Sequence, residues 1–139
     1  MITAFIISKI EGRLEPLADL RKQRFPRLDY AMDGVTVEGT KIKVNYEFSA
    51  TYFDSDAKNA KSIGDLKLGG YVELEETKEV ADKVSKKWAD SKMLPPEMAE
   101  DVLNNLNFRC GATGTLVAYS LGLIPPLVIT RTKVEEKKQ

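Results

Sequence analysis

Two stretches of the chain alternate between apolar and polar residues with a period of two. In the first, which spans residues 42 to 52, the apolar positions are Ile42, Val44, Tyr46, Phe48, Ala50 and Tyr52. In the second, which spans residues 66 to 74, they are Leu66, Leu68, Val72 and Leu74. Because successive side chains of a strand point to opposite faces of a sheet, both stretches are predicted to form half-buried antiparallel strands. The turn-rich residues 54–59 predict the hairpin loop between them.

The N-terminal part of the chain predicts a third strand and then loses its regularity. We expect the strand to span Thr3 to Leu14, with Gly12 as a candidate bulge. The apolar run at its start is short and follows no basic residue, so it is typical of a strand rather than of a signal peptide. From Leu17 to Asp33 the apolar residues are scattered among basic ones. This part is expected to be a long connection with one short helical turn.

After Glu75 the period becomes that of a helix. The apolar positions of a first helix, of about 13 residues, are Val80, Ala81, Val84 and Trp88. Prolines at positions 95 and 96, followed by acidic residues, predict the start of a second and longer helix that ends at Gly122. Its expected sheet-facing residues are Ala99, Val102, Leu103, Leu106, Cys110, Thr113, Val117, Ser120 and Leu121.

The other face of the long helix becomes uncharged halfway along, and no residue between Cys110 and Thr130 is charged. We interpret this as burial on both sides, by the sheet and by a helix of another subunit. The expected oligomer interface is Gly111, Thr115, Ala118, Tyr119 and Gly122. A membrane span is the less favoured alternative, because prolines, glycines and hydroxyls interrupt the stretch. Residues 124–129 are expected to form a final extended segment suited to a sheet edge, within one domain of residues 1–132 that precedes a charged tail of residues 133–139.

Composition narrows the classes of function. The chain has 139 residues, about one domain's worth. Its 21 basic residues balance its 21 acidic ones, so its charge indicates no polyanionic partner. It has no histidine, which excludes the usual general base of a catalytic triad and the commonest transition-metal ligand. A single cysteine permits no internal disulfide and fits a reducing cytosol, so we expect a cytoplasmic protein without metal or cofactor.

Several short motifs suggest chemistry, but each has a simpler structural interpretation. Asp54 and Asp56 begin like a calcium loop whose later ligand positions do not fit, so a plain turn is expected. Glu73 and its neighbours are expected on the solvated face of a strand rather than in an acid/base pair. The glycines of residues 111–114 fall inside the helical pattern, and Cys110 is expected to be a small core residue.

One basic cluster, residues 21 to 27, contains an aromatic residue, as single-stranded nucleic-acid sites do. Four basic residues in a chain without net charge are weak support for a nucleic-acid site, so we expect no nucleic-acid partner. The aromatic residues and leucines between Leu17 and Met32 have no place in the alternation of the predicted strands, so a protein-binding groove is an open interpretation. The alternative is that they close an end of the core.

The order of the parts resembles the SecB family of export chaperones. The residues that carry the resemblance are Phe5 and Ile10 in the first strand, residues 43–48 and 68–74 in the next two strands, and the Gly-Leu-Ile-Pro-Pro-Leu motif of residues 122–127. The resemblance implies an α+β protomer with a four-stranded antiparallel sheet, a short helix and a long C-terminal helix, assembled as a dimer of dimers. This chain lacks the acidic balance of the family, which puts a partnership with the translocation motor in doubt.

The resemblance also implies ATP-independent binding of non-native polypeptides, through apolar contacts and strand addition to an open sheet edge. The expected peptide-binding residues are Leu20, Phe25, Leu28, Tyr30, Met32, Tyr46 and Tyr71. A second hypothesis is a non-enzymatic interaction or scaffold subunit with one dedicated protein partner, such as a toxin-antitoxin or translocation component. A third is an enzyme that uses Asp54, Asp56 or Glu73. We favour the first, with no catalytic residues and no membrane insertion.

Overall fold

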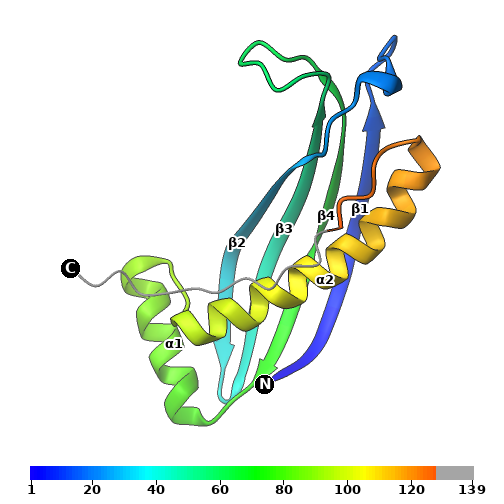
Figure 1. The fold of residues 1–139 in the computed structure, drawn as a ribbon. Helices are drawn as coiled ribbons and strands as arrows, with labels where there is room; N and C mark the ends of the chain where they lie inside the picture. The colour runs from blue at the N-terminus through cyan, green and yellow to red at the C-terminus, as the bar shows by residue number, and fades with distance from the viewer. Residues whose placement is uncertain (128–139) are drawn as a thin grey trace.

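The computed structural model describes residues 1–127 of the chain and contains a four-stranded antiparallel sheet and two helices (Figure 1). The strands are β1 (Ile2–Leu14), β2 (Arg27–Glu38), β3 (Lys41–Phe53) and β4 (Ser62–Glu75), in the spatial order β1-β4-β3-β2. A short helix α1 (Lys78–Ser91) and a long helix α2 (Pro96–Leu121) follow. The predicted α+β class is therefore confirmed. The tail of residues 133–139, and the end of the domain expected at residue 132, lie outside the described residues.

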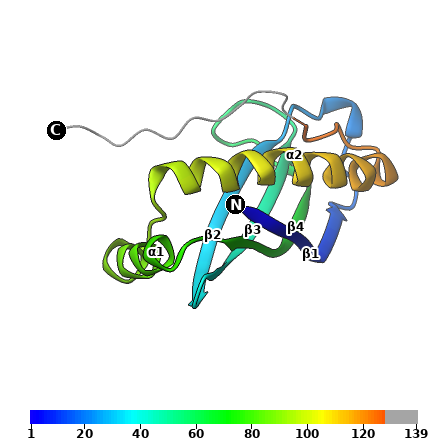
Figure 2. The same cartoon turned by 90° about the horizontal axis from the view of Figure 1, so that it is seen from below.

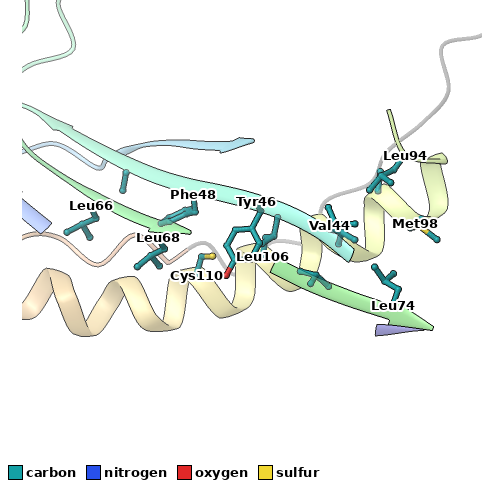
Figure 3. Packing of buried hydrophobic residues seen from close by; sticks show 14 of the residues in the cluster. Val44, Tyr46, Phe48, Leu66, Leu68, Leu74, Leu94, Met98, Leu106 and Cys110 are labelled. Carbon is teal, nitrogen blue, oxygen red and sulfur yellow. The ribbon is translucent and has the colours of Figure 1, made fainter. Parts of the chain in front are cut away.

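The two central strands are those that the alternating pattern predicted. All six apolar residues of residues 42–52 are buried, as are Leu66, Leu68, Val72 and Leu74 of β4. These side chains project from one face of the sheet toward α2, where Leu106 and Cys110 meet them (Figure 3). The opposite face carries polar residues such as Lys43, which is opposite Glu73 in the register of β3 and β4. The core is thus a single layer between the sheet and the helices.

The long helix lies across one face of the sheet and passes diagonally over the strands (Figures 1 and 2). Its 26 residues form a rod about 39 Å long and about 10 Å wide, whereas four strands span about 15 Å between their outer axes. One helix therefore covers the central strands more completely than the edges. Accordingly, the inward side chains of β3 are buried, and the inward side chains of β2 are only partly buried.

Strand β2 falls in the region for which the sequence predicted a long connection, and that prediction was wrong from Arg27 onward. The inward residues of β2 are Leu28, Tyr30 and Met32, and then Val35 and Val37. A register shift between Met32 and Gly34 moves the inward positions from even to odd numbers. Such a bulge interrupts the period of two, which is why the pattern was not recognisable as one strand. The short helical turn is confirmed, as a 3₁₀ turn at Leu20–Lys22.

Strand β1 has the predicted position, but its bulges are not at Gly12. The register shifts fall between Ile2 and Ala4 and between Ile7 and Lys9. Gly12 instead lies under the end of α2, where a Cβ atom would come within 2.8 Å of the Leu121 side chain. This glycine therefore permits close approach of the helix to the strand.

Both helices have the predicted ends. In α1 the side chain of Thr77 accepts a hydrogen bond from the Val80 amide, which satisfies one of the amides that a helix start leaves unpaired. Helix α2 begins after Pro95 and ends at Gly122, whose φ of 73° lies in the left-handed region that glycine favours.

The buried face of α2 differs from the expected one in its second half. The residues that it buries are Met98, Ala99, Val102, Leu106, Cys110, Gly111, Gly114 and Ala118. Ser120 is exposed instead of packing on the sheet. The reason is that the chain after Gly122 folds back along the helix. Pro126 packs against Gly114 and Leu127 packs against Gly111, and each occupies the space that a Cβ of the glycine would need.

The described part of the predicted final extended segment, up to residue 127, therefore packs against α2 and not at a sheet edge. The Tyr52 hydroxyl donates a hydrogen bond to the Ile124 carbonyl, which links this segment to β3. Residues 128 and 129 of the predicted segment lie outside the described residues.

Two adjacent glycines of β4 provide a test of the strand packing. A Cβ at Gly70 would lie 1.9 Å from the Ile6 carbonyl oxygen, whereas a Cβ at Gly69 would meet only ordinary contacts of 3.6 Å or more. We expect Gly70→Ala to lower the free energy of unfolding by about 2–3 kcal/mol, because β1 must move away, and Gly69→Ala to change it by less than about 0.5 kcal/mol. Urea denaturation measures both. Equal effects of the two substitutions would contradict the β1–β4 packing described here.

Candidate functional site

The connection between β1 and β2 crosses the end of the sheet from one edge strand to the other. We call residues 15–26 the crossover segment. The Glu15 amide donates a hydrogen bond of 2.7 Å to the Ile63 carbonyl of β4, and the Arg24 amide donates one of 3.1 Å to the Phe53 carbonyl of β3. The segment therefore lies across the ends of the two central strands (Figure 1).

One side chain of the crossover segment fixes it to the end of α2. The Gln23 amide group donates hydrogen bonds of 3.0 Å to the carbonyls of Leu20 and Gly122, and its oxygen accepts one of 2.7 Å from the Ile124 amide. Leu20 is partly buried and packs near Gly122, where its Cδ1 atom lies 3.2 Å from the place of a Cβ. These contacts hold the backbone of the crossover segment in place, and those of its side chains that are not buried face the solvent.

The expected peptide-binding residues of β2 lie together. Leu28, Tyr30 and Met32 lie on the inward face of this edge strand and are partly buried. The Tyr30 hydroxyl donates a hydrogen bond of 2.7 Å to Asn107 of α2, and its ring packs 5.2 Å from that of Phe48. The apolar surface here lies between the edge strand and the helix.

Phe25 lies just before β2, and 54% of it is exposed. It lines an open cleft of about 530 Å³ between the crossover segment and the loop of residues 54–61. Leu17 is fully exposed and has a φ of 69°, a left-handed conformation that is rare for leucine. Exposed apolar side chains therefore lie at this end of the sheet.

The other two expected peptide-binding residues lie elsewhere. Tyr46 is buried under α2, where its ring stacks on Phe5 at 5.2 Å and its hydroxyl donates a hydrogen bond to the Ile6 carbonyl. Tyr71 lies on the polar face of the sheet, with the Lys43 ammonium 4.2 Å from its ring centre. It borders a separate depression of about 320 Å³. Of these two residues, Tyr46 belongs to the core, and Tyr71 belongs to a different face from Leu28, Tyr30 and Met32.

The expected oligomer interface also divides between the two sides of α2. Gly111 and Ala118 are buried within the protomer. This burial corrects the prediction that they belong to an oligomer interface. Thr115 is partly buried, and its hydroxyl donates a hydrogen bond to the Gly111 carbonyl. Gly122 ends the helix. Tyr119 is 71% exposed.

The outward face of α2 carries an apolar stripe of which sequence reasoning named Tyr119 but not the other members. It consists of Phe108, Ala112, Leu116 and Tyr119. Phe108 and Leu116 are each 69% exposed. Positions separated by four, four and three residues share one face of a helix, so this spacing was a usable signal. It was missed because the small residues next to it suggested a tighter helix contact.

The candidate catalytic carboxylates have structural roles or are dispersed. Asp54 accepts a hydrogen bond from the Lys61 amide within the hairpin loop, as the turn interpretation predicted. Glu73 lies exposed on the polar face of β4. Among residues 1–127, no three residues of His, Cys, Asp or Glu form a group that could hold a metal ion. No helix in the same range is long and apolar enough to cross a membrane.

Burial raises the pKa of several weak acids in the core. It raises the pKa of Tyr30 and Tyr52 to about 12, and it raises that of Tyr46 as well, with Cys110 as a further cause for Tyr30 and Tyr46. Burial also raises the pKa of the Cys110 thiol to about 12. The thiol is therefore protonated at neutral pH, which agrees with its prediction as a core residue and not a nucleophile.

These pKa values predict a loss of stability in alkali. The ordinary pKa is 9.0 for cysteine and 10.0 for tyrosine, and the pKa in the folded protein is near 12 for both Cys110 and Tyr52. At a pH between the ordinary and the folded pKa, the unfolded chain releases protons that the folded protein keeps. Stability is therefore full below about pH 9 and falls as the pH rises toward 12. We expect Tyr52→Phe to reduce this slope, measured by urea denaturation from pH 8 to pH 11. A wild-type stability that is constant over this range would contradict the burial of these groups.

Comparisons with known proteins show a similarity of fold. No protein-family model matches the sequence, and no curated protein matches it. Among solved structures, the chain is similar to the SecB-like chaperone Rv1957 of Mycobacterium tuberculosis, in complex with a ChAD peptide from the Rv1956 HigA1 antitoxin. The match has a TM-score of 0.59 and covers 100% of this chain and 92% of that chain, with 7% sequence identity. The part of the chain that the structure describes thus shares its fold with that SecB-like protein.

Proposed function

We propose that the protein is an ATP-independent chaperone that holds non-native polypeptides in the cytoplasm. The observation that carries this proposal is the SecB-like fold, which matches from end to end a chaperone solved with a peptide bound. The neutral composition, without histidine, supports a binding protein that uses no cofactor and performs no catalysis.

The proposed binding surface combines the edge strand β2 with the crossover segment. An edge strand has backbone amides and carbonyls without a neighbouring strand, and β2 is the last strand of the sheet. A client chain can add to such an edge whatever its sequence, because every polypeptide has the same backbone groups. Leu28, Tyr30, Met32 and Phe25 would supply apolar contacts beside it, because they are only partly buried or exposed. Leu20 would contribute through the position of the crossover segment.

We propose that Tyr71, another of the expected peptide-binding residues, makes a separate contact on the polar face of the sheet. Its ring is open to the depression that Ser8, Lys9 and Asp33 also border. Tyr46 would act only indirectly, by supporting β1 through its hydrogen bond to Ile6.

We also propose that α2 joins protomers into an oligomer, with a dimer of dimers as the expected form. The stripe of Phe108, Ala112, Leu116 and Tyr119 exposes large apolar side chains on the face of α2 that is turned away from the sheet. Contiguous apolar surface of this kind marks an interface in soluble proteins, and a helix from a second copy would present the same stripe. The proposed interface includes Tyr119, with Thr115 beside it.

A dedicated protein partner is the alternative function. The similar chaperone is in complex with a peptide of an antitoxin, which is consistent with recognition of one dedicated segment. An antitoxin or a translocation component would be a partner of this kind. A pull-down that recovers one partner at fixed stoichiometry would favour this alternative, and recovery of many unfolded chains would favour the holdase.

Client capture tests the principal proposal. Without ATP, a stoichiometric excess of the protein should suppress the aggregation of a chemically unfolded client, measured by light scattering. We expect Phe25→Ser to raise the concentration needed for half protection by about fivefold to tenfold, because an exposed aromatic contact is lost. Met93→Ser, which changes another exposed apolar residue on the α1–α2 connection, is the matched control and should have no effect. A wild-type protein that leaves aggregation unchanged would contradict the proposal.

Solution mass tests the assembly. We expect a tetramer by multi-angle light scattering at low salt and at about 0.5 M salt, because apolar burial is not screened by ions. The double substitution Phe108→Ser with Leu116→Ser should yield smaller species, whereas Met93→Ser should leave the mass unchanged. A wild-type monomer under both conditions would mean that α2 joins no copies.

A further inference from the structure

The cleft at the end of the sheet has two walls from different parts of the chain. Arg24, Phe25, Pro26 and Arg27 form one wall, and the hairpin loop forms the other with Ser55, Asp56, Ala57, Lys58 and Ala60. Phe53 also lines it. The hydrogen bond from the Arg24 amide to the Phe53 carbonyl joins the walls. The cleft lies at the end of the sheet that is far from α1 (Figure 1).

The charge of this cleft is predominantly positive. Arg24, Arg27 and Lys58 are exposed, and none of them forms an ion pair with another residue in the range 1–127. Asp56 is the one acidic residue among those that line it. Of the nearby carboxylates, Asp19 accepts a hydrogen bond from the Arg21 side chain, and Asp54 accepts one from the Lys61 backbone amide. A chain of zero formal net charge therefore concentrates unpaired cations around one cleft.

The same cleft presents apolar surface between the charges. Phe25 is about half exposed, and Phe53 is partly buried. Strand β2 starts at Arg27, directly beside the cleft, and is an edge strand of the sheet that residues 1–127 form. A bound segment that leaves the cleft in this direction meets backbone groups with which it can pair.

We propose that this cleft selects acidic segments of polypeptide clients. Carboxylates of the segment bind Arg24, Arg27 and Lys58, an apolar side chain packs on Phe25, and the backbone continues along the edge of β2. Arginine favours carboxylates because its guanidinium can donate two parallel hydrogen bonds. This inference rests on the proposed function, and it adds the class of segment that is preferred.

The structure favours a polypeptide over a single-stranded nucleic acid. A nucleic acid has a phosphate at every nucleotide and needs a continuous basic track with several stacking aromatics. Here Asp56 interrupts the basic residues of the cleft, and Phe25 is its one strongly exposed aromatic residue. An extended peptide with carboxylates near an apolar residue fits this spacing of charges.

Three fluorescent peptides of the same length and apolar pattern test the selection, with Glu, Gln or Lys at the remaining positions. Fluorescence anisotropy at low salt should show that the Glu peptide binds about tenfold more tightly than the Gln peptide, and the Lys peptide most weakly. The preference should shrink at about 0.5 M salt. Equal affinities for the Glu and Gln peptides would overturn the proposal. An oligothymidine that binds more tightly than the Glu peptide would overturn it in favour of a nucleic-acid site.

Charge reversal locates the effect. Arg24→Glu with Arg27→Glu should lower the affinity for the Glu peptide by about tenfold and should strengthen binding of the Lys peptide. Lys83→Glu with Lys86→Glu makes the same change in net charge on the exposed face of α1, far from the cleft, and should leave the order of the three peptides unchanged. An equal loss in both double variants would assign the preference to net charge and overturn the cleft.

Aggregation assays with one acidic and one basic client separate this proposal from the function on which it rests. If both clients are protected equally by the wild type and by Arg24→Glu with Arg27→Glu, the holdase stands and the selection is overturned. If neither client is protected, the holdase fails, while the peptide measurements still decide whether the cleft binds acidic segments. Selective loss of protection of the acidic client supports the proposal.

Discussion

The structure depends on how one helix covers the apolar face of a sheet that is wider than the helix. Helix α2 lies diagonally over four strands, and the inward side chains of the two central strands are buried beneath it together with residues of α1 and of the segment after α2. The inward side chains of β2 receive partial cover only. Burial of apolar area stabilises the fold by about 25 cal/mol per Å², so the partly covered edge retains apolar surface that another chain can still bury. The proposed client site follows from this incomplete coverage.

The close contact between helix and sheet is made possible by small residues. Gly12 lets the end of α2 approach β1, and Gly111 and Gly114 accept the returning segment of residues 123–127. The small residues of α2 therefore serve packing within the protomer. The large side chains of Phe108 and Leu116 are left on the outward face with Tyr119, whereas the sequence suggested that small residues would dominate that face.

The sequence predicted those elements whose pattern is uninterrupted. Strands β3 and β4, both helices and their ends follow from periods of two and 3.6 and from caps such as Gly122. Strand β2 was not recognisable, because the bulge between Met32 and Gly34 changes the phase of its inward residues. A bulge is a property of pairing between two strands, and a single sequence contains no direct signal for it. The fourth strand was expected only from the resemblance to SecB proteins.

The candidate site was predicted in part for the same reason. Leu28, Tyr30 and Met32 were chosen because they lacked a place in the recognised strands, and they lie together on the edge strand. Tyr46 was misplaced because alternation cannot distinguish a groove from the core under a helix. The cleft around Phe25 requires two loops that are distant in sequence, so the basic cluster alone could not reveal it.

Hydrogen–deuterium exchange with and without an unfolded client tests the central claim most directly. The account predicts that a client slows exchange of backbone amides in residues 24–33, which belong to the crossover segment and the edge strand β2. Amides of residues 108–119 should be unaffected by the client, because we propose that this part of α2 contacts another protomer instead. Protection confined to α1 or to the polar face of the sheet, with residues 24–33 unchanged, would contradict the account.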